Sequence, residues 1–175
     1  MTPSVQSPLA ALLVAAACST APEYPTPPPD DLAPYSWTTP SSEDIDILET
    51  VFRYQFEHNR SVATERNEAD YLFVVLGEED SIDPPAELLA RFASHLPPVR
   101  PLSAATVSVY GVEHQDDGGQ GILLRIERIR RIDANTVDVD GGYFECGTSS
   151  SGSTYRVKRR GSGWRVVADA DWWIS

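Results

Sequence analysis

The chain has few of the residues that usually mark a disulfide framework, a metal centre or a surface for nucleic acid. Two cysteines in 175 residues exclude a small domain held by several disulfides. The three histidines are scattered without the spacing of a zinc site, so we expect no metal and no cofactor. With 14 basic and 26 acidic side chains, the net charge is −12, which argues against a protein whose whole surface binds nucleic acid or anionic lipid.

The chain also has no apolar run long enough to cross a bilayer. Its longest apolar run lies near the N-terminus. Crossing a bilayer takes about 20 apolar residues, whereas the run from Leu9 to Ala17 suits the apolar centre of a signal peptide. It ends at Cys18 after three alanines, and small residues before a cysteine resemble the lipobox of bacterial lipoproteins. The resemblance implies a signal peptide over 1–17, a lipidated Cys18, and a cell-envelope protein that meets the membrane through its lipid.

The segment before Cys18 departs from the lipobox pattern in two respects. Ala15 stands where the pattern prefers leucine, and no lysine or arginine precedes Leu9. Two alternatives therefore stay open at this point. An ordinary secretory signal would leave Cys18 as a thiol able to bridge to Cys146 in an oxidising compartment. The other alternative is a cytoplasmic protein whose apolar start arose by chance.

Segment 18–40 is rich in proline, threonine, serine and aspartate and has almost no aliphatic residues. Such a composition does not bury enough apolar surface to offset its ordering entropy, and its prolines favour extended polyproline II. We therefore predict a stiff, solvated tether that could hold a domain up to about 70 Å from a lipid. A single domain should follow over 41–175, because this length suits one core.

Periodic apolar residues predict two helices and one strand in the first half of the domain. A helix is expected over 42–58, where acids follow a capping serine and apolar residues recur at helical spacing. Residues 71–76 are a continuous apolar run, typical of a buried strand. A second helix should begin near Pro84 and end before Pro97. Its buried stripe would be Leu88, Leu89, Phe92 and Leu96.

The second half of the domain has the sequence pattern of antiparallel strands. Ten of the eleven glycines lie at or beyond Gly111, and they separate short segments in which apolar and polar residues alternate. The predicted strands are 121–132, 137–146, 154–159 and 164–174, with turns at 133–135, 147–153 and 161–163. The first should carry a bulge near Glu127. In the last, strict alternation would place Trp172 in the core and Asp171 in solvent.

The order of helix, strand, helix and meander predicts an α+β fold. We expect an antiparallel curved sheet of four to five strands with two helices packed on one face. The ending, with Tyr155-x-Val157, Trp164-x-Val166 and the final Trp172 to Ser175, resembles the last hairpin of NTF2-like and cystatin-like domains. The wider stretch from Gly141 resembles a loosely defined group of bacterial secreted proteins. The resemblance covers about the last 60 residues and implies no particular activity.

Basic residues gather in the last third of the chain. Between Ile122 and Arg165 there are nine basic and five acidic side chains. Cross-strand ion pairs would use many of them, and the alternative is a patch for an anionic glycan or for lipid headgroups. The candidate anion-binding residues are Arg125, Arg128, Arg130, Arg131, Arg156, Lys158, Arg159 and Arg160.

No nucleophile in the sequence has a base beside it, which favours a non-enzymatic binding or structural module over an enzyme. Its partners would be an anionic glycan or another envelope protein. The alternative is an NTF2-like small-ligand pocket or enzyme, lined by Asp169, Asp171 and Trp172, in which an apolar wall raises the pKa of a carboxylate on the concave sheet face. The two hypotheses differ in whether Asp169 or Asp171 faces a cavity or bulk water.

Overall fold

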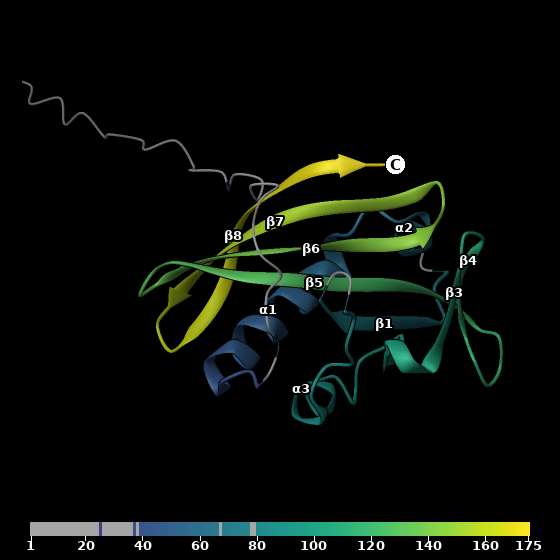
Figure 1. The fold of residues 1–175 in the computed structure, drawn as a ribbon, viewed down its shortest axis with the longest axis horizontal. Coiled ribbons are helices and arrows are strands. Elements are labelled where there is room, and N and C mark those ends of the chain that lie inside the picture. The colour runs from purple at the N-terminus through teal and green to yellow at the C-terminus, as the bar shows by residue number, and fades with distance from the viewer. Residues whose placement is uncertain (1–24, 26–36, 38, 67, 78–79) are drawn as a thin grey trace, which may run out of the picture.

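The computed structural model describes residues 25, 37, 39–66, 68–77 and 80–175. Within them, the chain forms one mixed sheet of eight strands and three α-helices (Figure 1). The strands are β1 Tyr71–Leu76, β2 Val99–Pro101, β3 Ala105–Ser108, β4 Gly111–His114, β5 Gln120–Asp133, β6 Thr136–Cys146, β7 Ser149–Arg160 and β8 Gly163–Ile174. The helices are α1 Ser42–His58, α2 Val62–Arg66 and α3 Ala86–Arg91, and a 3-10 turn, η1, spans Leu102–Ala104.

Helix α1 and strand β1 span the residues predicted for them. The start of α1 is fixed by a reciprocal cap: the Asp44 N–H donates to the Ser41 hydroxyl at 3.2 Å, and the Ser41 N–H donates to the Asp44 carboxylate at 3.0 Å. Its apolar face is buried as expected, and Gln55 is buried with it.

Helix α3 is shorter than the helix predicted between Pro84 and Pro97. It begins only after Pro85, because a residue that precedes proline is biased towards extended backbone. Leu88 and Phe92 are buried as predicted, whereas Leu96 is 84% exposed because it lies beyond the helix. The prediction was therefore right about the core contacts and wrong about the last turn.

The predicted antiparallel sheet of four to five strands with two helices on one face is wrong. The strand order is β2-β1-β5-β6-β7-β8, with β4 also paired to β5 and β3 to β4. Strand β1 runs parallel to both β2 and β5. A parallel pair needs a long crossover, and the connection from β1 to β2 supplies one through α3. Strands β2 to β4 are only three or four residues long, too short to show a clear two-residue period.

The long strands β5 to β8 form the predicted meander. The register between β5 and β6 skips Glu127, which confirms the predicted bulge. Strand β7 begins at Ser149, five residues before the predicted start. Its serines and Gly152 have turn-like composition, but they pair with β6 on one side and β8 on the other, and this pairing overrides their local preference.

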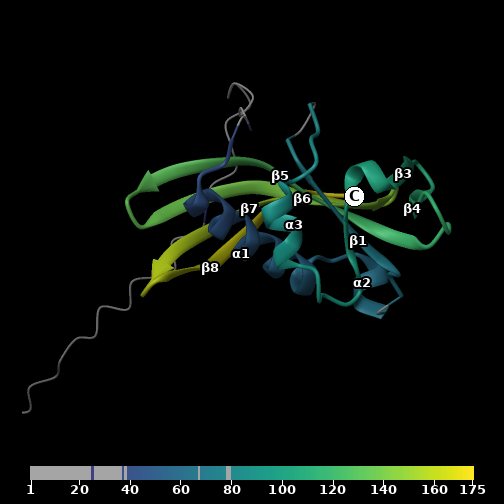
Figure 2. The same cartoon turned by 90° about the horizontal axis from the view of Figure 1, so that it is seen from below.

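Two apolar clusters lie on opposite faces of the sheet. The larger is covered by α1, which packs along one face (Figure 2), and includes Val139 and Tyr155. The smaller lies on the other face, where Phe73, Val112 and Leu123 pack with Phe144. Strands β3 and β4 stand at one end of the sheet beside this smaller cluster (Figure 1). A side chain of β5 to β8 is therefore assigned to a face by its register with these core residues.

Strand β8 does not keep the strict alternation that the sequence suggests. Its register with β7 skips Val167 and Trp172, and each extra residue reverses the face that follows. As a result, Asp169 and Asp171 face α1, and Trp173 lies on the opposite side. The prediction that Trp172 is core and Asp171 is in solvent is wrong: the Asp171 side chain is only 19% exposed and contacts residues of the α1 side.

Most of the predicted tether, and all of the predicted signal peptide with Cys18, lie outside the described residues. Of the tether residues that the structure describes, Pro25 is buried and Trp37 is half-buried against the α1-side core. The tether is therefore not solvated at every position. Among the described residues, every helix is too short or too polar to span a membrane.

Candidate functional site

A row of four residues crosses the sheet on the face opposite α1. The registers pair Arg125 of β5 with Gly142 of β6, Gly142 with Gly152 of β7, and Gly152 with Trp173 of β8. Because the two central residues have no side chain, the Trp173 indole lies directly over Gly152, and a hollow with a backbone floor remains over Gly142. A guanidinium stands at one end of this hollow and an indole at the other.

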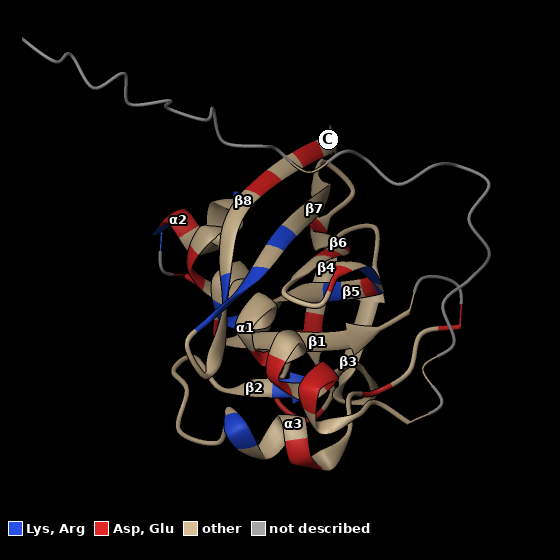
Figure 3. Ribbon diagram, turned by 90° about the vertical axis from the view of Figure 1, so that its left-hand side faces the viewer, with Lys and Arg blue, Asp and Glu red and all other residues tan. Residues whose placement is uncertain are grey.

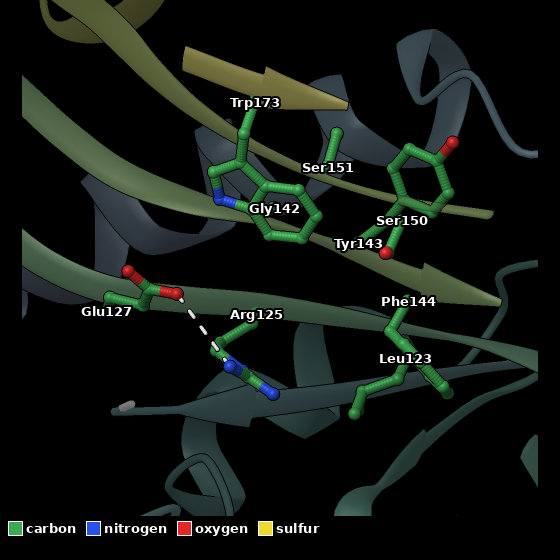
Figure 4. Close-up of a pocket in the computed structure, with 9 residues that line it drawn as sticks. All are labelled: Leu123, Arg125, Glu127, Gly142, Tyr143, Phe144, Ser150, Ser151 and Trp173. Atoms are coloured by element: carbon green, nitrogen blue, oxygen red, sulfur yellow. Dashed lines mark ion pairs between the residues drawn. The ribbon is translucent and has the colours of Figure 1, made fainter. Parts of the chain in front are cut away.

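This hollow is a pocket of about 120 Å³, which we call the Arg125–Trp173 pocket (Figure 4). Leu123 and Phe144 form its apolar side, two register pairs away from Arg125 and Gly142 and therefore on the same face. Glu127 approaches from the other side of Arg125. The lining residues are Leu123, Arg125, Glu127, Gly142, Tyr143, Phe144, Ser150, Ser151 and Trp173.

Both glycines are needed where they stand. A Cβ at Gly152 would lie 2.2 Å from Nε1 of Trp173, so the indole rests directly on this glycine. At Gly142, a Cβ would lie 1.9 Å from the Ser151 carbonyl oxygen, which is main chain and has little freedom to move. Trp173 itself is 44% exposed. The Trp173 wall of the pocket is therefore half exposed to solvent, whereas the floor at Gly142 is main chain of the sheet.

Arg125 is only loosely neutralised. Its Nη1 lies 3.8 Å from Oε1 of Glu127, too far for a hydrogen bond, and the two side chains are 34% and 17% exposed. Its Nε is buried and has no hydrogen-bond acceptor within the described part of the chain. A buried donor without an acceptor costs about 1–3 kcal/mol. The part of the Arg125 side chain that remains exposed, 34%, lies beyond this buried nitrogen.

The other basic residues on this face are used within the sheet. Arg156 holds the Asp138 carboxylate with two hydrogen bonds of 2.8 and 2.9 Å. Arg130 holds Asp140 in the same way, with two bonds of 3.0 Å. Thr154 also donates to Asp140, at 2.8 Å. Both aspartates are 1% exposed, so these pairs are structural and are not open to an external anion.

The remaining candidates lie elsewhere. Arg131 contacts Asp44 at 2.7 Å, and Arg159 contacts Glu43, so both arginines reach the N-terminal turn of α1. Arg128 lies opposite Asp140 in the register, Lys158 is half-buried, and Arg160 is exposed at the end of β7. Figure 3 shows basic bands along β7 and acidic bands on the last part of β8. Ion pairs at several places of the sheet, instead of one patch, hold five of the eight predicted residues: Arg125, Arg130, Arg131, Arg156 and Arg159.

A second polar cluster lies between α1 and the last strands. Asp169 accepts a hydrogen bond from the Tyr54 hydroxyl at 3.0 Å. Asp171 accepts one from the Ser153 hydroxyl at 2.6 Å and pairs with Arg60 at 3.0 Å. These contacts answer the question raised by the sequence, because both aspartates face the α1 side and not bulk water. Trp172, predicted to line the same pocket, is not among its lining residues.

The protonation of this second cluster is set by burial and by its aspartates. Burial, helped by the hydrogen bond to Asp169, raises the pKa of Tyr54 to about 12. Burial also raises the pKa of Tyr155 to about 12. The amide of Gln55 donates to the Tyr155 hydroxyl at 3.2 Å and to the Arg125 carbonyl at 3.1 Å. The space they enclose is about 20 Å³, room for roughly one water molecule.

No family model, curated protein or solved structure was found to be similar to this chain.

The sequence indicated Arg125 but missed the rest of its pocket. Gly142, Gly152, Phe144 and Trp173 lie on three different strands and meet only through the register. Two glycines at paired positions of neighbouring strands are the signal that could have found it, because paired glycines leave a hollow in a sheet surface. To use that signal, the start of β7 has to be known to within one residue.

Proposed function

We propose that the chain is an exported cell-envelope protein, anchored by a lipid at Cys18, whose domain is a non-enzymatic binding module. The observation that carries the binding role is the Arg125–Trp173 pocket. It combines an apolar side, a half-exposed aromatic wall and a guanidinium that lies 3.8 Å from the nearby Glu127 carboxylate, and this mixture of apolar walls and a few polar groups is typical of a small-ligand site. The Pro-rich segment after Cys18 supports the anchored reading, because a lipoprotein needs a spacer.

The binding role is tested by closing the pocket. Gly152→Ala places a methyl group where the Trp173 indole lies and should displace it. The matched control is Gly163→Ala, because a Cβ at Gly163 meets nothing within 4 Å. A set of small acids, sugars and neutral aromatic compounds would be screened by ligand-observed NMR. We expect compounds that bind the natural protein and Gly163→Ala but not Gly152→Ala. A screen with no binder, or binders indifferent to Gly152→Ala, would refute the role.

The anchoring is tested on the full chain in a bacterial host. Labelled fatty acid should enter the protein, and the protein should partition into detergent. Cys18→Ser should abolish both, and Cys146→Ser, which leaves the predicted lipidation site intact, is the control. Labelling that survives Cys18→Ser, or a mature chain that starts after residue 18, contradicts the lipoprotein proposal.

A second candidate is an enzyme or ligand pocket at the α1 face, favoured by the observation that Asp169 and Asp171 face α1 and contact Tyr54 and Ser153. Its weakness is space, since a cavity of about 20 Å³ does not admit a substrate unless α1 and β8 separate. Binders in the same NMR screen that are lost on Asp169→Asn, and kept on Gly152→Ala, would favour this candidate over the first.

A further inference from the structure

We propose that the Arg125–Trp173 pocket recognises a carboxylate carried on a small flat body, with the carboxylate on the Arg125 guanidinium and the flat body against Trp173. This inference rests on the proposed binding function of the same pocket and adds the chemistry of the ligand. It concerns a single cation at one end of an apolar hollow, so it differs from the dispersed basic patch that the sequence suggested.

The need for an anion follows from Arg125. Its two Nη groups form one planar edge of donors, which matches the two oxygens of a carboxylate. The carboxylate of Glu127 stays 3.8 Å from Nη1, beyond hydrogen-bond distance. A ligand carboxylate at hydrogen-bond distance would therefore add bonds that the protein does not make for itself.

Glu127 argues for a singly charged anion. Its carboxylate is 17% exposed and close to the guanidinium, so an incoming anion meets one positive and one negative group. A dianionic phosphate would feel this repulsion twice and would find only one arginine, whereas a monocarboxylate feels it once. Two other arginines on this face are committed to structural pairs: Arg130 to Asp140 and Arg156 to Asp138.

The flat body is required by the rest of the pocket. The hollow has backbone for its floor at Gly142, the Trp173 indole on one side, and the side chains of Leu123 and Phe144 on another (Figure 4). A slot of about 120 Å³ between aromatic and aliphatic walls suits a ring or a similar planar group better than a branched one. Stacking on Trp173 would also order a side chain that is 44% exposed.

The carboxylate could belong to a free aromatic or unsaturated acid or to an acidic sugar at the end of a glycan, since both carry the same recognition group. The probes are therefore benzoate, its neutral isostere benzamide, and glucuronate. Affinities would be measured by NMR titration of the intact domain. A compound of this size should bind with a dissociation constant on the order of 1 mM.

We expect benzoate to bind at least tenfold more tightly than benzamide. Arg125→Gln should remove that preference, while Arg160→Gln, which changes the net charge equally at an exposed position, should keep it. Glu127→Gln should tighten benzoate several-fold, because it removes the competing charge. These changes have opposite signs at neighbouring positions, so a general loss of folding does not imitate them.

The outcomes separate the two proposals. Equal binding of benzoate and benzamide, both lost on Gly152→Ala, keeps the pocket as a ligand site and overturns carboxylate recognition. Binding of neither benzoate, benzamide nor glucuronate overturns carboxylate recognition, and it refutes the binding module too if the wider screen finds no binder. Tighter binding of benzoate than of glucuronate supports the inference and assigns the ligand to free planar acids. The reverse keeps carboxylate recognition, assigns the ligand to acidic glycans and overturns the flat body, because a sugar ring is puckered.

Discussion

The ion pair between Asp138 and Arg156 gives the sharpest test of the sheet. The Asp138 side chain is 1% exposed, and that of Arg156 is 9% exposed, so the pair is removed from water on both sides. Asp138→Asn keeps the shape of the side chain but leaves Arg156 without its carboxylate. Breaking a buried pair in this way costs about 3–5 kcal/mol, a large part of the ~5–15 kcal/mol that holds a domain together.

Urea unfolding measures this cost directly. With a slope of about 2 kcal/mol per M, the midpoint should fall by roughly 2 M. The control is Asp46→Asn, the same substitution in an ion pair with Arg91, where the aspartate is 53% exposed. An exposed pair is worth about 0–1 kcal/mol, so its midpoint should move by less than about 0.5 M.

A double variant, Asp138→Val with Arg156→Leu, should recover most of the stability, because replacing both charges leaves no unpaired ion. If Asp138→Asn shifts the midpoint no more than Asp46→Asn does, the pair is not desolvated. The account of the basic residues given above would then be wrong, and this face of the sheet would be open to external anions.

Three further predictions concern Tyr155, Glu145 and Trp172. The folded protein keeps Tyr155 protonated to about pH 12, while the unfolded chain loses that proton near pH 10. The part of the stability that comes from Tyr155 should therefore be complete below pH 10 and fall as the pH rises towards 12, by up to roughly 1.4 kcal/mol per pH unit. Tyr155→Phe should remove this part of the fall in denaturant titrations and leave the smaller part due to Tyr54, whose pKa is also raised to about 12. Glu145 accepts hydrogen bonds from the Val62 and Ala63 N–H groups at 2.9 and 3.1 Å, so Glu145→Ala should cost about 1 kcal/mol by thermal unfolding and raise amide exchange in α2 first. Trp172→Ala should lower the free energy of unfolding by less than the ~3–5 kcal/mol of a fully buried tryptophan, because Trp172 is only partly buried. A loss in that range, measured by urea unfolding, would show that Trp172 is a core residue.

How far the sequence predicts this fold depends on how local the signal is. The capped apolar stripe of α1, the run of β1 and the bulge at Glu127 all produce their pattern within a few residues, and each was predicted. The parallel pairing of β1 with β5 was missed because it joins Leu72 to Ile122, fifty residues apart. Nothing in either strand's own pattern distinguishes a parallel from an antiparallel neighbour.

The candidate site was only partly predictable for a related reason. Asp169 and Asp171 were recognised as candidates, but their facing depends on the unpaired Val167 in β8. One extra residue reverses every side chain after it, and the alternating letters of β8 conceal where the insertion falls. The glycine row was missed because it requires three registers to be known at once.

The order in which the sheet is assembled constrains when the domain can fold. Strands β5 to β8 follow one another as hairpins, but α1, near the start of the domain, packs on β8 at its end, and the bond from Tyr54 to Asp169 joins positions 115 residues apart. Contacts between such distant positions form late and slowly. When the chain is synthesised from its N-terminus, α1 therefore has no strand β8 to pack on until the last residues have been added. For a protein exported as proposed here, this delay keeps the polypeptide in the unfolded form that can be threaded through a translocation pore.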